Sequence, residues 1–292
     1  MPNSFGFDSR IMITGLVRNA EKTLAIDLEI LDNAFRNFPN RYYYFVESDS
    51  KDSTLRILEE CSRTFDKFEF VSLGNLDDSI PVREDRISHC RNQYLKALKL
   101  NPSYSHIDFL VVADMDGVNA NLNASGIESC MENSNWGACF ANQEKYYYDI
   151  YALRHPEWSP NDCWAYEREL LLAGLPHIEA REKAVYARQR KIPPNSDWIS
   201  VTSAFGGLGI YDASYLVGAN YSSRDEDGSI TCEHVSFNER ISSKGIPLYI
   251  NPKLINSRRN SHTSNRRLLN RLKWLIKLVL VKVSRKYAKK RI

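Results

Sequence analysis

The sequence predicts an α/β protein in which helices cover a largely parallel sheet. Short apolar runs rich in β-forming residues alternate four times with helix-like segments over about 110 residues. In addition, three of these apolar runs end in charged or amide side chains, which is where open α/β sheets bind their ligands. Together, the two observations predict a sheet with one polar, ligand-binding edge.

The elements of the first half follow from their apolar spacing. The segment 10–17, RIMITGLV, is a short apolar run that ends in Arg18 and Asn19, as a buried strand does when it leads into a polar loop. Residues 21–38 carry apolar side chains on one helical face, namely Leu24, Leu28, Leu31, Phe35 and Phe38. The same alternation predicts strands at 41–48, 68–73 and 107–114 and helices at 52–65 and 83–100.

The second half is less regular. We expect strands at 135–142 and 246–252, and one further strand with a glycine-rich bend at 200–211. The region 160–200 is expected to be helical and rich in loops, and a helix is expected to begin within 232–241. We interpret residues 1–256 as one domain and residues 257–292 as a separate basic tail.

The composition is that of a soluble globular protein, with 292 residues, 43% hydrophobic and 26% charged. Residues 257–292 hold 13 of the 39 Lys and Arg residues and no acid, which leaves a net charge of −10 on the rest of the chain. The N-terminus lacks the charged and apolar regions of a signal peptide. The six cysteines show no CxxC spacing, so we expect a cytosolic protein without disulfides or a zinc site.

The segment 108–119, DFLVVADMDGVN, places Asp114 and Asp116 directly after an apolar run. Two carboxylates so close together repel each other, and a bound cation relieves that repulsion. Mg²⁺ and Mn²⁺ prefer carboxylate oxygens and keep coordination positions open for phosphate. We therefore predict a metal site that binds a nucleotide diphosphate, with a solvated turn as the alternative.

The order of several motifs resembles that of GT-A glycosyltransferases. The first four are GLVRNAEKTL, YYFVESDSKDST, RISHCRNQYLKAL and DFLVVADMDG, and they are followed by YYDIYALR, FGGLGIY and CEHVSFN. Within that class, the chain is most similar over residues 10–256 to the capsular α-1,3-mannosyltransferase type of fungi and its bacterial relatives. The resemblance implies a Rossmann-like mixed sheet flanked by helices and a nucleotide-sugar donor, bound with Mn²⁺ or Mg²⁺.

The resemblance also implies that the polar clusters at the strand ends bind the donor. Arg18 and Asn19 would face the nucleotide or its diphosphate, whereas Glu47 and Asp49 would hold the base or the ribose. Asp114 would contact the donor as well as the metal ion. The alternative for these residues is a role in solvated loops and turns.

The helix expected at 83–100 carries further donor-binding candidates. Arg86 and Arg91 suit a diphosphate because guanidinium groups match the geometry of phosphate oxygens. Asn92 would donate hydrogen bonds to sugar hydroxyls. A charged helix surface is the alternative interpretation.

Candidates for the acceptor side lie in the second half of the chain. Glu233 would act at the acceptor hydroxyl, either as the general base of an inverting enzyme or as a positioning group in a retaining one. We expect Asp149, Arg154, Gly207 and His234 to contact the acceptor. The alternatives are a helix-terminal carboxylate for Glu233 and a bulged strand at Gly207.

Enzymes of this class usually add a third metal ligand, often a histidine late in the chain. His262 lies at the corresponding place, and His234 is the rival candidate.

The segment 266–292 is basic and contains Trp and Leu at helical spacing, but its apolar runs are too short to span a membrane. We expect an amphipathic helix that lies on an anionic membrane surface. Docking on the chain's own domain is the alternative. We expect no nucleic-acid partner, because the body is acidic.

From these features we predict a metal-dependent glycosyltransferase at the cytosolic face of a membrane. It would move a hexose from a UDP- or GDP-sugar to a glycan, or to a lipid-linked glycan, in surface polysaccharide synthesis. The rival predictions are a sugar-phosphate nucleotidyltransferase and a non-catalytic membrane-bound module that binds nucleotides or carbohydrates.

Overall fold

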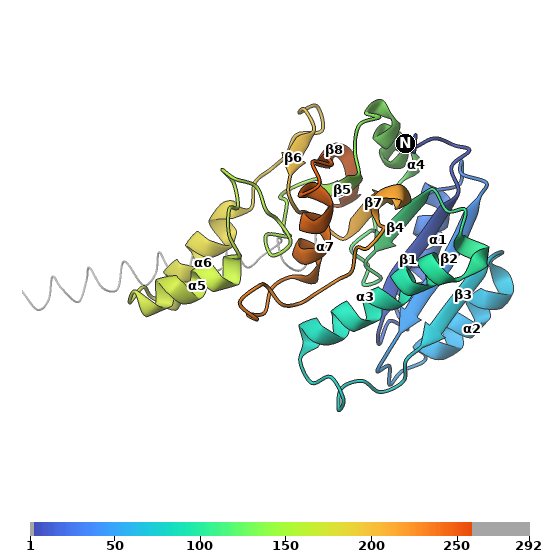
Figure 1. Ribbon diagram of the computed structural model, residues 1–292, viewed down its shortest axis with the longest axis horizontal. Helices are drawn as coiled ribbons and strands as arrows, with labels where there is room; N and C mark the ends of the chain where they lie inside the picture. Colours follow the sequence, from blue (N-terminus) through green and yellow to red (C-terminus); the bar gives the residue numbers. More distant parts are fainter. Residues whose placement is uncertain (1–2, 259–292) are drawn as a thin grey trace, which may run out of the picture.

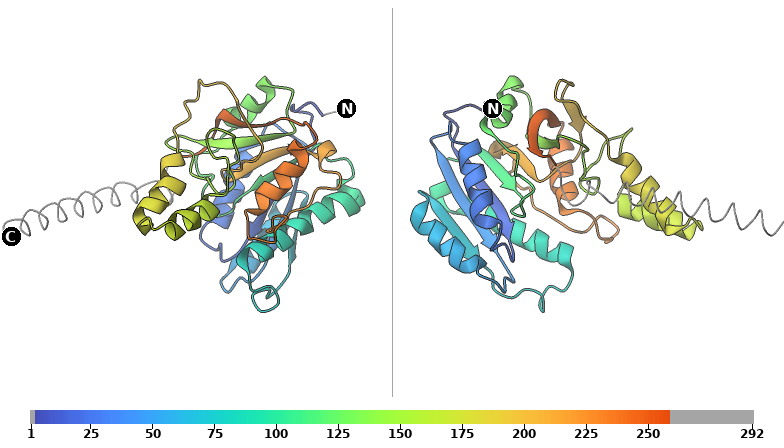
Figure 2. Two further views of the ribbon diagram at one scale, coloured as in Figure 1. Left: turned by 60° about the vertical axis from the view of Figure 1, so that its left-hand side comes forward. Right: turned by 180° about the vertical axis from the view of Figure 1, so that it is seen from behind.

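The computed structural model describes residues 3–258 (Figures 1 and 2). A single sheet of eight strands runs through it in the order β3-β2-β1-β4-β7-β5-β8-β6. The strands are β1 (Ile11–Val17), β2 (Arg41–Glu47), β3 (Phe68–Ser72), β4 (Phe109–Ala113), β5 (Ala138–Gln143), β6 (Ile199–Val201), β7 (Leu208–Asp212) and β8 (Leu248–Ser257). The helices are α1 (Leu24–Ala34), α2 (Thr54–Thr64), α3 (Arg83–Leu100), α4 (Ala124–Glu128), α5 (Cys163–Leu172), α6 (His177–Ala184) and α7 (Glu233–Ser242).

The sheet is mixed, so the predicted fold class is confirmed. Strands β1 to β4 are parallel to one another, and the helices between them supply the crossovers. Strand β7 is antiparallel to both β4 and β5, whereas β8 is parallel to β5 and antiparallel to β6.

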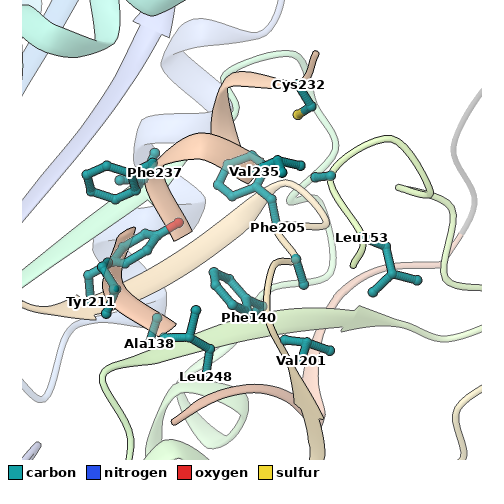
Figure 3. Packing of buried hydrophobic residues seen from close by; sticks show 14 of the residues in the cluster. Ala138, Phe140, Leu153, Val201, Phe205, Tyr211, Cys232, Val235, Phe237 and Leu248 are labelled. Atoms are coloured by element: carbon teal, nitrogen blue, oxygen red, sulfur yellow. The ribbon is translucent and has the colours of Figure 1, made fainter. Parts of the chain in front are cut away.

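Helices cover both faces of the sheet (Figures 1 and 2). Helices α1 and α2 lie on one face, where Leu24, Leu28 and Leu31 of α1 are fully buried, as predicted. Helices α3 and α7 lie on the other face. There Phe237 of α7 packs on Tyr211 of β7, which in turn contacts Phe140 of β5 (Figure 3).

The sequence prediction was wrong in three places, one of which is the strand predicted at 246–252: as β8, it continues to Ser257. Helix α1 ends at Ala34, although Phe35 and Phe38 remain buried in the turns that follow. The single strand predicted over 200–211 is two strands, β6 and β7, which lie apart in the sheet. The stretch between them contains Gly206 and Gly207, whose φ angles of 69° and 89° interrupt a strand.

Part of the prediction concerns residues that are not described. His262 and the helix expected over 266–292 lie outside residues 3–258, so the basic tail and the domain boundary stay predictions. Within the described part of the chain, no helix combines the length and the apolar character needed to cross a membrane. The six cysteines are all free and buried.

Candidate active site

A cavity of about 360 Å³ lies beyond the carboxyl ends of β1, β2 and β4. The ends of these strands line it together with residues 83–91 of α3 and the first turn of α7. This is the edge of an open α/β sheet where ligands bind. Nine of the predicted site residues line the cavity: Arg18, Asp49, Arg86, Arg91, Asp114, Asp116, Asp149, Glu233 and His234.

The two acids of the Asp-x-Asp motif line the cavity at this edge of the sheet. The backbone N–H of Asp114 donates to the carbonyl of Gly207 at 3.0 Å, which continues the pairing of β4 with β7 into the cavity. Burial raises the pKa of Asp114 to about 7; Arg91 lowers it in part, and the charges of Asp116, Asp149 and Glu233 raise it further. The carboxyl of Asp114 therefore lies among several acids, with Arg91 as its ion-pair partner.

This carboxylate pair fits a hard divalent cation. The cation would offset both the burial of Asp114 and its repulsion from nearby acids, which together raise its pKa, and carboxylate oxygens are the ligands that Mg²⁺ and Mn²⁺ favour. Residues 3–258 contain no group of three or more His, Cys, Asp or Glu side chains arranged around one ion. Asp114 and Asp116 would thus hold the ion, with its remaining positions open to water, phosphate or a ligand beyond residue 258.

Arg91 links two acids of the cavity that come from different elements, Asp114 and Glu233. Its Nε donates to Glu233 Oε1 at 2.9 Å, and its Nη2 lies 3.5 Å from Asp114 Oδ1. The guanidinium also lies over the rings of Phe205 and Tyr221. Arg91 is only 5% exposed, and its Nη1 has no hydrogen-bond partner among residues 3–258. This buried cation therefore fixes the carboxylate of Glu233.

Two further arginines, Arg18 and Arg86, also line the cavity. Arg18 and Arg86 both bind the carboxylate of Asp77, which bridges them at 2.9 and 3.0 Å. Asp49 holds the backbone next to Asp77 in place, because its Oδ1 accepts hydrogen bonds from the N–H groups of Leu76 and Asp77. Asp77 thus shows where an anion with two oxygens fits between these guanidinium groups.

The first turn of α7 supplies Glu233 and His234. The imidazole of His234 stacks on Phe205, with ring centroids 3.7 Å apart. Burial, together with the charge of Arg91, holds the pKa of His234 well below its ordinary value, so the ring is neutral. Neither ring nitrogen has a hydrogen-bond partner within residues 3–258. A neutral imidazole in this position can accept or donate one hydrogen bond to a ligand hydroxyl.

Five predicted residues do not line the cavity but bind segments beside it. Asn19 Oδ1 accepts the N–H of Lys51, and the carboxylate of Glu47 accepts the N–H of Ser50 at 2.9 Å. Both contacts shape the loop after β2, which carries Asp49.

The other three hold parts of the second half in place. Asn92 exchanges hydrogen bonds with the backbone of Tyr221. The guanidinium of Arg154 donates to two carbonyls and pairs with Asp162 at 3.2 Å. The carbonyl of Gly207 accepts the N–H of Asp114.

Sequence reasoning missed the residues that support the Asp-x-Asp loop. The carboxylate of Asp27 accepts the N–H of Gly117 at 3.1 Å, and the hydroxyl of Thr23 donates to the carbonyl of Met115. Asp27 could have been found from the sequence, because it is a lone acid on the apolar face of the predicted helix. On the opposite side, the buried amide of Asn119 donates to the carbonyl of Asp114 at 2.9 Å. Nothing in its sequence context marked Asn119.

Comparisons with known proteins give structural matches only. No family model matches the sequence, and no curated protein matches it. Three of the solved structures that match are a mannosyltransferase from Pyrobaculum calidifontis in complex with GDP-Man and Mn²⁺, S. aureus TarS in complex with UDP-GlcNAc, and glucosyl-3-phosphoglycerate synthase from Mycobacterium tuberculosis in complex with UDP.

These likenesses are distant. Sequence identity to the three structures is 13%, 12% and 12%, and the TM-scores are 0.46, 0.47 and 0.44. The matches cover 91%, 88% and 89% of this chain and 60%, 61% and 75% of the other three. This chain thus spans less than two thirds of the first two. Because all three TM-scores are below 0.5, the functional inferences that follow rest on the geometry of this chain.

Proposed function

We propose that this chain is a metal-dependent GT-A glycosyltransferase that moves a hexose from a UDP- or GDP-sugar to a glycan acceptor. One observation carries the proposal: two carboxylates suited to a divalent ion share a single cavity with Arg18, Arg86 and Arg91. Paired acids and clustered guanidinium groups are the chemistry that binds a nucleotide diphosphate with its cation.

The donor would lie along the ends of β1, β2 and β4. Asp114 and Asp116 would hold the ion, which neutralises the charge of the diphosphate when bound. Arg18 and Arg86 would bind phosphate oxygens in the position that Asp77 occupies. The loop after β2 would contact the base or the ribose, which is the role predicted for Glu47 and Asp49.

The acceptor would bind between the first turn of α7 and the loop that carries Asp149. During transfer, the bond between the sugar C1 and the diphosphate oxygen breaks, a bond from C1 to the acceptor oxygen forms, and the acceptor hydroxyl loses its proton. Glu233 would take that proton in an inverting reaction, or orient the hydroxyl in a retaining one. Arg91 orients Glu233 for either role, and His234 would bind a neighbouring hydroxyl.

The cellular setting is part of the same proposal. The basic segment 266–292 would hold the enzyme on the inner face of an anionic membrane, where lipid-linked glycans of surface polysaccharides are extended. His262 would add a third ligand to the ion.

A two-stage experiment tests the proposed activity. Thermal-shift measurements with UDP- and GDP-hexoses, each with and without Mn²⁺, would first identify the donor. Release of nucleotide would then be measured for the wild type, for Asp116→Ala and for Glu59→Ala, which removes an exposed acid of α2 far from the cavity. We expect Asp116→Ala to lose Mn²⁺-dependent turnover without loss of thermal stability, and Glu59→Ala to keep it.

Unchanged turnover in Asp116→Ala would reject the metal role. Binding of a nucleotide sugar without nucleotide release, whatever the acceptor, would instead indicate a binding module. Release of pyrophosphate from a nucleoside triphosphate and a sugar phosphate would indicate a nucleotidyltransferase.

A further inference from the structure

A chain of three buried side-chain amides lies behind the Asp-x-Asp loop. It consists of Gln143 at the end of β5, Asn256 near the end of β8, and Asn119 after β4, each no more than 2% exposed. Gln143 Nε2 donates to Asn256 Oδ1 at 3.2 Å, and Asn256 Nδ2 donates to Asn119 Oδ1 at 2.9 Å. The donors therefore all point in one direction, towards the loop.

The chain ends on the backbone that carries the acids. Asn119 Nδ2 donates to the carbonyl of Asp114 at 2.9 Å and to the carbonyl of Gly207 at 3.1 Å. Because these two residues are themselves joined by the Asp114 N–H, a single amide group holds both sides of the junction between β4 and β7. The position of the Asp114 carboxylate thus depends on Asn119.

The two glycines before β7 turn their carbonyls towards the same amides. The carbonyl of Gly206 accepts from Gln143 and from Asn256, at 3.0 and 2.8 Å. A Cβ on Gly206 would lie 2.9 Å from Gln143 Nε2, and one on Gly207 would lie 2.7 Å from Val118 Cγ1. With φ angles of 69° and 89°, both residues have a backbone that side-chain-bearing residues rarely adopt. The amides therefore fit against this turn only because Gly206 and Gly207 carry no side chains.

We propose that Asn119 is a positioning residue for the metal site, and that the Gln143–Asn256–Asn119 chain orients it. This inference rests on the proposed function, because it assigns the chain to the ion that Asp114 and Asp116 would hold. Groups that orient metal ligands from behind typically change metal affinity by about 10- to 100-fold when removed. A chain that served stability alone would not act on affinity in this way.

Asn251 provides a matched control. Its side chain is fully buried, and its amide donates to Ser129 Oγ at 2.9 Å, on a part of β8 that does not line the cavity. Alanine at Asn119 or at Asn251 removes an equally buried amide and leaves polar partners without a hydrogen bond. The two variants should therefore lose similar stability but differ in metal binding.

The test measures Mn²⁺ affinity directly, without turnover. Titration followed by the electron paramagnetic resonance signal of free Mn²⁺ would give Kd for the full-length wild type and for Asn119→Ala, Asn119→Ser and Asn251→Ala. We expect Kd to rise at least about tenfold in Asn119→Ala. Asn119→Ser, which keeps a hydroxyl donor, should show a smaller rise. Asn251→Ala should stay within about twofold of the wild type, because it does not touch the loop. Thermal unfolding of each variant would confirm that it is folded.

The outcomes separate this inference from the proposed function. Wild-type affinity in a folded Asn119→Ala would overturn the positioning role alone, as would an equal loss of affinity in Asn251→Ala. If Asn119→Ala and Asn119→Ser both failed to fold, the amides would be a stability element and the positioning role would again be wrong. If the wild type bound no Mn²⁺ even with nucleotide present, both the proposed function and the positioning role would be rejected.

Discussion

The two halves of the described chain are held together in different ways. In residues 3–113, apolar side chains of four parallel strands pack against α1, α2 and α3. In residues 114–258, the strands run in both directions and several loops are buried. Every buried Asn or Gln of residues 3–258 lies in this second half: Asn119, Asn142, Gln143, Gln189, Asn238, Asn251 and Asn256.

The difference shows how the site is divided between the halves. The first half supplies the cations, Arg18, Arg86 and Arg91, from regular elements and the loops that follow them. The second half supplies most of the acids, and hydrogen bonds between residues far apart in the sequence hold the backbone at Asp114. A buried amide must be paired to be tolerated, so each such pair fixes one loop in one position.

The largest effect is expected where the two halves meet, at Arg91. Arg91→Met would leave Glu233 buried without its cation, and we expect a loss of about 3–5 kcal/mol in the free energy of unfolding. The double variant Arg91→Met/Glu233→Gln should regain part of that loss, because no uncompensated carboxylate remains. Urea unfolding of both variants measures this. Equal losses in the single and the double variant would show that the ion pair does not join the halves.

A change at Gly207 would sharpen the comparison within the second half. Gly207→Ala combines a left-handed backbone with a Cβ 2.7 Å from Val118, whereas Gly218→Ala has a similar φ of 76° and open space around it. We expect losses of about 2–3 kcal/mol for Gly207→Ala and about 1 kcal/mol for Gly218→Ala. Urea denaturation of the two variants gives both values. Similar losses would mean that the backbone angle matters and the tight packing at this turn does not.

The smallest effect concerns Asp27, where the first half contacts the Asp-x-Asp loop. Burial raises the pKa of Asp27 to about 6, although the Gly117 N–H lowers it in part. The folded chain therefore holds a proton that the unfolded chain has already lost, so stability falls as the pH rises from about 4 to 6 and stays lower above.

Asp27→Asn keeps an acceptor for Gly117 and removes this penalty. We expect it to be more stable than the wild type by about 1–2 kcal/mol at pH 7.5, with little difference at pH 4. Unfolding measured at both pH values would show this, with Glu29→Gln as a control for an exposed charge on the same helix. A difference that does not depend on pH would contradict the raised pKa.

The same division explains how much could be predicted from the sequence. In the first half, apolar spacing alone located all four strands and three helices, because burial there follows the period of each element. In the second half, apolar spacing predicted a single strand over 200–211, and that prediction was wrong. Gly206 and Gly207 interrupt the strand there, and β7 lies between β4 and β5, apart from β6.

The candidate site was predictable where a residue ends a strand or begins a helix. Arg18, Asp114 and Glu233 lie at such positions, and all three line the cavity. The partners of these residues were not predictable. The bridge between Arg18 and Asp77 spans 59 residues and that between Asn119 and Asn256 spans 137, so both pairs depend on a fold that local pattern does not encode.

The position of Asn256 in β8, which follows the other described strands in the sequence, also affects how the protein is made. The ribosome releases a chain from its N-terminus at about 5–20 residues per second. The strands β1 to β4 therefore leave the ribosome before the segment that completes the amide chain. Until β8 inserts between β5 and β6, the nascent chain carries the loop of Asp114 and Asp116 without the support of Asn256. Binding competence should accordingly emerge only after residue 256 has left the ribosome.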